Sequence, residues 1–248
     1  MAHDPGLYGR SFADVYDQWY RDVSDVAGTV ARICELAKAG SVLELGSGTG
    51  RLAGPIADAG VSITALDASP EMNDRFAAKG HPCPIVEADM AVLPFAADSF
   101  DVVFIAFNTI CNLTAPSAQR ACIDRVAGVL HPGGHLVVEV LVPPEPDLTP
   151  RSATSLRSDD GEVVILTSTT QGDDADHVVG RHVEIHPGGR RRIRPWELRW
   201  ISPGRLDELC DDAALTLVDR RADWRGTPFD GAADSHVSTY RRLRTALT

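Results

Sequence analysis

The stretch ELGSGTG, residues 44–50, decides the fold of this chain, because it places three glycines between an apolar run and a helical pattern. The run before it, residues 41–45, has the composition of a short buried strand. Residues 52–59 follow with a helical pattern that Gly60 ends. Glycines let a chain turn tightly and let a ligand approach the backbone without a Cβ in the way. The stretch therefore predicts a strand–turn–helix unit whose turn can face a ligand.

The same alternation of short apolar runs and helical patterns continues to residue 142. Ser69 and Pro70 provide an N-cap and a proline suited to the first turn of a second helix. Strands that alternate with helices of this length indicate right-handed βαβ units and a parallel sheet. Further strands are expected at residues 61–66, 85–88, 101–107 and 135–142, and further helices at residues 69–79 and 117–130.

The pattern changes after residue 142. Residues 143–150 read PPEPDLTP and indicate a proline-rich crossing rather than a helix. The predicted fold class is α/β, with a Rossmann-like, mostly parallel seven-stranded sheet and an antiparallel β insert after the fifth strand. The insert is expected to hold three strands, at residues 162–170, 177–186 and 190–200, before a helix at 202–210 and strands at 215–218 and 237–243.

The net charge of −11 at pH 7 argues against a nucleic-acid substrate, because a phosphate backbone repels an acidic surface. No stretch approaches the ~18 consecutive apolar residues that a membrane span requires. The N-terminus lacks a basic region followed by an apolar one, so we expect no signal peptide and a cytoplasmic location. The five cysteines contain no C-x-x-C pair and predict neither a zinc ribbon nor a disulfide framework.

Two acidic residues follow later strands of the same sheet. Asp67 ends the second expected strand, 21 residues after Gly46, where a carboxylate can accept hydrogen bonds from two ribose hydroxyls. Asp89 follows the third strand, and the carboxyl ends of parallel strands share one edge of the sheet. Amide groups at the start of the first helix can also receive a polar ligand group. These features predict a nucleoside site at this edge.

Details of the glycine stretch separate the candidate nucleotides. A dinucleotide fingerprint needs a third glycine where this chain has Arg51, and a phosphate-binding P-loop needs GK[ST], which is absent. Glu44 lies within the turn, where its carboxylate would repel a pyrophosphate but suits a cationic ligand. The residues therefore favour a nucleoside with a positively charged tail.

At these residues the chain resembles the class I S-adenosylmethionine-dependent methyltransferases, in which an acid and one further residue precede Gly-x-Gly-x-Gly. ELGSGTG matches that motif in full, and DASPEM, EADM, FDVV and the L-x-PGG approach to the fifth strand are also similar. FNTICNL, WISPGRLDEL and HVSTYRR are similar to bacterial small-molecule methyltransferases that carry an antiparallel insert. The resemblance implies S-adenosyl-L-methionine as the cofactor and S-adenosyl-L-homocysteine as its product.

The resemblance also implies which residues surround the cofactor. Gly46, Ser47 and Gly48 are expected beside its methionine part, with Glu44 below the turn. In similar enzymes an N-terminal helix closes over the cofactor with a tyrosine facing it, a position that Tyr20 is expected to fill.

The later strands are expected to supply the rest of the cofactor site. The resemblance places Asp67 at the ribose hydroxyls and Ala68 near the adenine. It implies that Asp89 accepts a hydrogen bond from the adenine amino group, with the backbone of Met90 alongside. Phe107 is expected beside the methionine carbonyl region.

Methyl transfer mainly requires alignment of the reactants and exclusion of water, and a base matters only if the nucleophile arrives protonated. The catalytic candidates are Tyr16, which shares a helix face with Tyr20, Asn108 near the methyl-transfer space, and His182 in the insert. The insert also carries Glu184 and His186 on the strand face of His182, and these three could bind a metal or act as a base. No further ligand is obvious, so no metal site is predicted.

The insert also contains the densest basic run of the chain, Arg190–Arg194. Strand alternation sends three of its arginines to one face, where they could bind a substrate carboxylate or phosphate, or pair with neighbouring acids.

The order of the predicted helices and strands divides the chain into four parts. These are an N-terminal helical cap at 1–40, a cofactor-binding Rossmann-like core at 41–142, the insert at 143–201 and the C-terminal part of the core sheet at 202–248.

The predicted function is S-adenosylmethionine-dependent methyl transfer to an O, N or C nucleophile of a small molecule, with secondary metabolism as one setting. The insert, together with Pro143–Pro150, is expected to cover the substrate cavity or to form a dimer surface, which leaves a homodimer open. Neither a nucleic acid nor a membrane is expected as a partner. A nicotinamide-dependent oxidoreductase and a catalytically inactive S-adenosylmethionine-binding protein are the alternatives.

Overall fold

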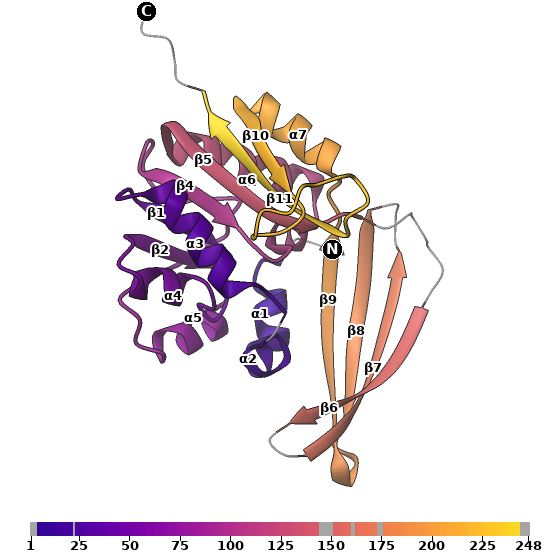
Figure 1. Cartoon of the computed structure of the whole chain (residues 1–248). Helices are drawn as coiled ribbons and strands as arrows, with labels where there is room; N and C mark the ends of the chain where they lie inside the picture. The colour runs from indigo at the N-terminus through magenta and orange to yellow at the C-terminus, as the bar shows by residue number, and fades with distance from the viewer. Residues whose placement is uncertain (1–3, 22, 144–150, 160–161, 173–175, 244–248) are drawn as a thin grey trace, which may run out of the picture.

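The centre of the protein is a seven-stranded sheet in the order β10-β11-β5-β4-β1-β2-β3 (Figure 1). The computed structural model describes residues 4–21, 23–143, 151–159, 162–172 and 176–243. The strands from β5 through β4, β1 and β2 to β3 run parallel, whereas β11 is antiparallel to both of its neighbours. The strands are β1 (Val42–Leu45), β2 (Ile63–Asp67), β3 (Ile85–Glu87), β4 (Phe100–Ile105), β5 (Leu130–Leu141), β10 (Leu215–Arg221) and β11 (Ser235–Arg242).

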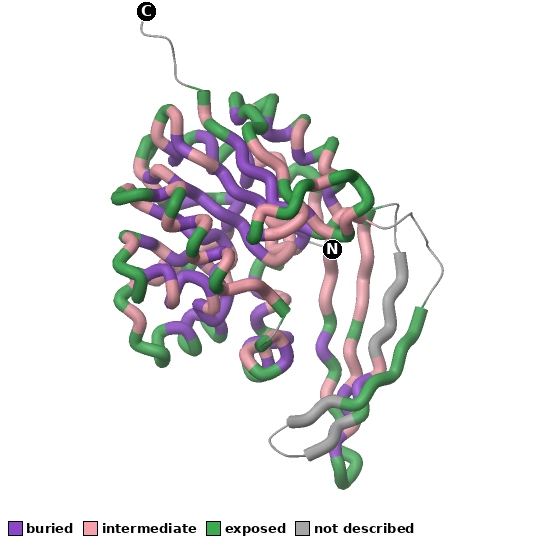
Figure 2. The backbone as a smooth tube through the Cα atoms, in the orientation of Figure 1, coloured by how far each residue is buried: buried purple, intermediate pink, exposed green. Residues whose placement is uncertain are grey.

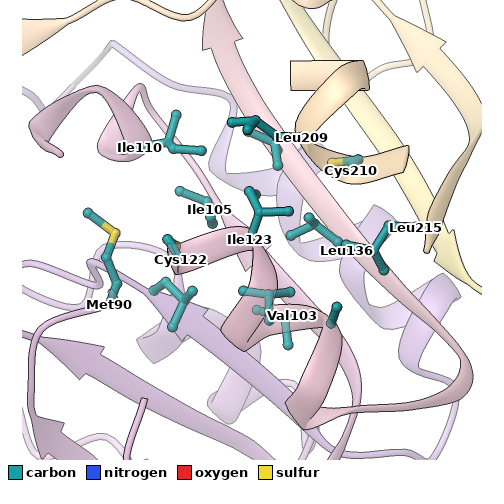
Figure 3. Close-up of a cluster of buried hydrophobic side chains, with 14 of the residues drawn as sticks. Met90, Val103, Ile105, Ile110, Cys122, Ile123, Leu136, Leu209, Cys210 and Leu215 are labelled. Carbon is teal, nitrogen blue, oxygen red and sulfur yellow. The ribbon is translucent and has the colours of Figure 1, made fainter. Parts of the chain in front are cut away.

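Helices cover both faces of this sheet, because parallel strands are buried on both sides. In β4, Val103 and Ile105 belong to a buried cluster with residues of α6 and α7, whereas Val102 and Phe104 belong to one with residues of α3, α4 and α5. Figure 3 shows part of the first cluster, and Figure 2 shows the buried strands at the centre. The helices are α3 (Val26–Ala37), α4 (Ala53–Asp58), α5 (Pro70–Ala77), α6 (Pro116–Val129) and α7 (Pro203–Asp212).

This arrangement confirms the predicted fold class, with the antiparallel insert after the fifth strand. The start of that strand differs from the expectation: β5 begins at Leu130, directly after α6, instead of at His135. Phe100 pairs with Leu130 and Val102 with His135, so the residues between bulge out of the pairing. Pro132 has no N–H to donate and Gly133 has φ +91°, and both features suit a bulge inside a strand.

The insert is a four-stranded antiparallel sheet in chain order, and it extends away from the central sheet (Figure 1). The expectation of three strands is wrong, because β6 adds a fourth that pairs with β7 along its whole length. Residues 151–156 of β6 are exposed. They read RSATSL, which lacks the alternating apolar pattern that predicts a strand. Residues 144–150 of the proline-rich crossing lie outside the described residues. The strands are β6 (Arg151–Asp159), β7 (Glu162–Gly172), β8 (His177–Ile185) and β9 (Arg191–Arg199), with the 3-10 turn η2 (Pro187–Gly189) before β9.

Two short helices, α1 (Leu7–Phe12) and α2 (Tyr16–Trp19), lie between the central sheet and the insert (Figure 1). We call residues 5–20 the N-terminal segment. Its Phe12 and Trp19 form a small buried cluster with Leu166 of β7. Helix α3, which also falls within residues 1–40, packs its buried face on the central sheet. Among the described residues, no helix is long and apolar enough to cross a membrane.

Gly50, the last glycine of the glycine stretch, is expected to tolerate no side chain. Its φ is +77°, and a Cβ would lie 2.1 Å from the ring of buried Phe76. Gly50→Ala should lower the free energy of unfolding by about 2–4 kcal/mol, as overpacking adds to the left-handed backbone cost. Gly60→Ala is the matched control, because Gly60 has φ +85° with nothing within 4 Å of the added Cβ. Urea unfolding measures both; equal losses would contradict the packing argument.

Candidate functional site

A cavity of about 270 Å³ lies at the carboxyl ends of the parallel strands, between the central sheet and the N-terminal segment. The topology provides this place, because β1 has β2 on one side and β4 on the other, and a crevice forms where the strand order reverses. Most residues expected from the sequence lie on its wall. They are Tyr16, Tyr20, Gly46, Gly48, Asp67, Ala68, Asp89, Met90, Phe107 and Asn108.

The glycine turn gives the cavity a backbone wall. The amides of Gly46 and Ser47 both donate to the carbonyl of Leu66, at 2.7 and 3.0 Å, and so attach the turn to β2. Gly48 has φ +55°, and a Cβ there would meet only Met72 Sδ at 3.9 Å and Tyr16 Cε1 at 4.0 Å. A Cβ would therefore fit there without a clash, and Gly48 lies on the cavity wall, so a ligand can lie against the main chain.

Asp67 connects this turn to the following helix. One carboxylate oxygen accepts a hydrogen bond from the amide of Gly48 at 2.8 Å, and the other accepts one from the amide of Ser69 at 2.9 Å. Burial raises the pKa of Asp67, and the hydrogen bonds from Ser69 and Gly48 oppose that rise. Each carboxylate oxygen can accept a second hydrogen bond, so Asp67 can still bind a pair of hydroxyls in the cavity.

The wall beyond Asp67 is mostly apolar. Leu66, Ala88, Met90 and Leu113 line the cavity there, and Asp89 adds one carboxylate. That carboxylate accepts a hydrogen bond from the amide of Ala91 at 2.8 Å, which fixes its position. An apolar pocket with the Asp89 carboxylate as a hydrogen-bond acceptor suits a flat ring that carries an amino group.

Phe107 and Asn108 follow β4 in the left-handed backbone region, with φ of +50° and +62°. The neighbouring strand β5 holds them there. Phe107 donates its amide to the carboxylate of Glu139 at 2.7 Å, and the side-chain oxygen of Asn108 accepts from the amide of Leu141 at 2.6 Å. Successive non-glycine residues in this region are costly, and such strain gathers at functional sites. The pair sets the wall of the cavity beside the N-terminal tyrosines.

Three tyrosines of the N-terminal segment form an aromatic wall opposite the glycine turn. The rings of Tyr16 and Tyr20 lie 4.8 Å apart, and Tyr20 packs edge-on against Phe107 at 5.8 Å. Tyr8 donates its phenol hydrogen to the oxygen of Tyr20 at 3.2 Å. Burial raises the pKa of Tyr8 and that of Tyr16, so both phenols are neutral near pH 7. They can donate and accept hydrogen bonds but do not provide a phenolate base.

Glu44 and Ser47 are buried but lie outside the cavity wall. Burial raises the pKa of Glu44 to about 8, although the charge of Arg51 and the amide of Ala53 oppose this. The guanidinium of Arg51 stacks on the ring of Phe107 at 4.8 Å and shares a hydrogen bond with Tyr16. Glu44 therefore lies beneath the turn as a carboxyl that is mostly protonated at neutral pH.

His182 lies among aromatic rings, away from the cavity wall. Its ring centroid is 5.6 Å from that of Phe12, 6.0 Å from Trp196 and 6.3 Å from Trp19. On the same strand face, Glu184 contacts His186 at 3.0 Å and also pairs with Arg194. Within the described parts of the chain, no group of three or more His, Cys, Asp or Glu side chains could hold a metal ion.

Several wall residues were not singled out from the sequence. Tyr8 could have been, because Tyr8, Phe12, Tyr16 and Tyr20 recur every four residues. Some of the others lie within the motifs DASPEM, EADM and FNTICNL, but the resemblance gave them no role. The others, taken together, come from five separate segments that only the folded chain brings together. They are Pro5, Gly9, Leu66, Met72, Ala88, Thr109, Asn112, Leu113 and Leu198.

Comparisons with known proteins give this geometry a family. Residues 42–134 match the family model described as a methyltransferase domain. A cypemycin N-terminal methyltransferase from a Streptomyces species is 30% identical over 176 residues, which cover 69% of this chain and 71% of that protein. The chain belongs to the class I S-adenosylmethionine-dependent methyltransferases. This confirms the resemblance seen in the glycine stretch and places the chain with methyltransferases rather than nicotinamide-dependent oxidoreductases.

Solved methyltransferase structures share the whole fold. The CcbJ methyltransferase from Streptomyces caelestis is 34% identical, with a TM-score of 0.85 over 97% of this chain and 99% of that one. The CalS10 amino pentose methyltransferase from Micromonospora echinaspora, solved with S-adenosylmethionine bound, is 19% identical, with a TM-score of 0.73 over 92% of this chain and 97% of that one. The second likeness shows the fold alone.

Other curated relatives match over part of their length. A demethylmenaquinone methyltransferase from Renibacterium salmoninarum is 36% identical over 121 residues, which are 49% of this chain and 46% of that protein. The chain spans less than half the length of the first curated relatives that it matches. The substrates in the names of these relatives therefore describe those proteins and are not assigned to this chain.

The raised pKa of Glu44 predicts a pH-dependent stability. A carboxyl with a folded pKa of about 8 stabilises the fold fully below its unfolded value near 4.5, and this contribution disappears as pH rises through 8. Glu44→Gln is neutral at every pH and removes this dependence. Relative to wild type, its free energy of unfolding should rise between about pH 5 and pH 8, by on the order of 1–4 kcal/mol.

Urea unfolding across that pH range measures the effect. Glu208→Gln is the control, because Glu208 is exposed on α7 and pairs with Arg205, also exposed, at 2.7 Å. A constant difference between Glu44→Gln and wild type at every pH would show that Glu44 is ionised in the folded protein.

Proposed function

We propose that this protein transfers a methyl group from S-adenosylmethionine to an amine nitrogen of a small molecule. The observation that carries the proposal is the cavity at the carboxyl edge of the sheet. It combines an open glycine turn, the Asp67 carboxylate and an aromatic wall. Bound S-adenosylmethionine supplies a methyl group already activated by a sulfonium, so the chain needs no covalent nucleophile.

The residues present fit this cofactor. The open space beside Gly48 accepts a ligand against the backbone, and Asp67 has acceptor capacity for two ribose hydroxyls. Asp89 and the backbone of Met90, with apolar neighbours, suit the adenine. A cation is tolerated here because the nearby charged side chains of the wall are carboxylates.

An amine is the acceptor that the aromatic wall favours. Methylation converts an amine into an ammonium ion, and the faces of Tyr8, Tyr16, Tyr20 and Phe107 attract cations. The neutral phenols can orient an amine by hydrogen bonds, and the proton of the product can leave to water. The match to the cypemycin N-terminal methyltransferase covers 69% of this chain, and the name of that protein supports an amine as the acceptor.

The wider setting belongs to this proposal as well. The name of the cypemycin relative supports a place in secondary metabolism. A cytoplasmic location and a homodimer built on the insert stay predictions from the sequence.

Asp67→Ala tests the cofactor site. Loss of the carboxylate should weaken S-adenosylmethionine binding by about 10- to 100-fold, because hydrogen bonds to a charged group are lost. Isothermal titration calorimetry measures the affinity. Asp101→Asn is the matched control, since Asp101 accepts a hydrogen bond from the amide of Ser41 at 2.8 Å, at the amino end of β1. Unchanged affinity in Asp67→Ala would reject the proposed position of the ribose.

Paired acceptors test the proposed nucleophile. Small molecules that differ only in an amine or a hydroxyl are incubated with enzyme and S-adenosylmethionine, and methylated product is detected by mass spectrometry. Amines should react, and the rate should rise with pH through the pKa of each amine, because only the neutral form has a lone pair. Reaction of the alcohols alone would reject an amine acceptor. Tight cofactor binding without transfer to either class would favour the inactive alternative.

A further inference from the structure

A buried guanidinium joins the insert to the N-terminal segment. Arg194 of β9 is only 1% exposed. Its Nε donates to Glu184 on the neighbouring strand, and Nη1 donates to the carbonyl of Ser11 at the end of α1. Nη1 and Nη2 also bind the two carboxylate oxygens of Asp14, at 2.6 and 2.9 Å. The guanidinium lies over the ring of Trp19 at 5.4 Å from its centroid.

The partners of Arg194 are part of the segment that forms the aromatic wall. Ser11 lies in the last turn of the helix that carries Tyr8, and Asp14 lies two residues before the helix that carries Tyr16. These helices have six and four residues, so they are too short to be stable alone. The positions of the tyrosines therefore depend on what the segment is attached to.

The segment has further attachments on both sides. On the insert side, Arg192 also pairs with Asp14, and Phe12 and Trp19 pack with Leu166. On the central sheet side, contacts at Gly9 and Asp17 attach it. Gly9 packs so closely on Ser69 that an added Cβ would lie 2.2 Å from its side chain. Asp17 accepts a hydrogen bond from Thr49 at 2.5 Å and one from Lys79 at 3.0 Å. The Lys79–Asp17 pair is partly exposed to water, whereas the Arg194 guanidinium is buried. Separating a buried charge from its partners costs more free energy than separating an exposed pair. Arg194 therefore restrains the position of the segment more strongly than Lys79 does.

We propose that Arg194 is a positioning residue for the cofactor site. It holds the tyrosines of the N-terminal segment against the cavity, and the insert thereby controls cofactor affinity without touching the glycine turn. The choice of residue fits this role. A planar guanidinium reaches Glu184, Ser11 and Asp14 at once, which the single ammonium of a lysine cannot do. The proposal takes the identity of the ligand from the proposed function.

Binding of S-adenosylhomocysteine to Arg194→Met, Arg194→Lys and Asp14→Asn tests this role. Calorimetry is performed at a temperature at which circular dichroism shows each variant to be folded. Arg194→Met should bind at least about tenfold more weakly than wild type, Arg194→Lys should recover only part of the loss, and Asp14→Asn should share it. The double variant Arg194→Met/Asp14→Asn should lose less affinity than the sum of the two single losses. Both changes remove the Arg194–Asp14 interaction, whereas Asp14→Asn also weakens the partly exposed pair with Arg192.

Arg220→Met is the matched control. Arg220 also binds an aspartate through both Nη atoms, Asp207 at 2.6 and 3.2 Å, but it joins β10 to α7 away from the cavity. Arg220→Met should lower the melting temperature of the protein and leave its affinity for S-adenosylhomocysteine within about twofold of wild type. An equal loss of affinity in Arg220→Met would mean that general destabilisation explains the result and would overturn the proposal.

Hydrogen exchange of peptides that cover residues 7–20 gives a second readout. In the free protein, Arg194→Met should speed exchange in these peptides, and Arg220→Met should not. Folded Arg194→Met with wild-type exchange there and wild-type affinity would overturn the role of Arg194. If wild type itself does not bind S-adenosylhomocysteine, the proposed function fails, and exchange in the free protein still decides whether Arg194 holds the segment.

Discussion

The Asp67 carboxylate is the interaction on which the rest of the site depends. It accepts one hydrogen bond from the glycine turn at Gly48 and one from the start of α5 at Ser69. A single side chain thus joins the ends of β1 and β2 to the helices that follow them. Because the turn is fixed against β2, the backbone beside Gly48 faces an open cavity instead of collapsing onto its neighbours. The same carboxylate has the remaining acceptor capacity that a ribose needs.

The electrostatics beneath the turn follow from burial. Glu44 extends into the core of the sheet, where burial raises its pKa to about 8, and the positive charge of Arg51 only partly offsets this. Arg51 itself stacks on Phe107, whose amide is held by Glu139 of β5. Since Glu44 is mostly protonated at neutral pH, the carboxylates at the cavity are those of Asp67 and Asp89, and the Arg51 guanidinium lies over the ring of Phe107. Such an environment suits a neutral or cationic nucleoside better than a pyrophosphate.

The wall opposite the turn is built by distant parts of the chain. Ser11 and Arg194 are separated by 183 positions in the sequence, yet the guanidinium binds the Ser11 carbonyl in the fold. His182, Glu184 and two arginines of β9, Arg192 and Arg194, lie on one face of the insert, as strand alternation predicts, and this face packs against the N-terminal segment. Alternation alone could not show what the face contacts. The insert thus supports the cofactor side of the enzyme.

The sequence by itself determined the family, the parallel core and the acids at its edge. These follow from local features: three glycines after a short strand, and carboxylates one or two residues beyond later strands, where chain direction alone places them at one edge. Only the tertiary structure decided which residues close the cavity. Strand β6 has no apolar alternation, and Asn112 and Leu198 reach the wall through packing between segments far apart in sequence. Buried pairs such as Arg194–Asp14 depend on that packing, because desolvation makes each charge require the other.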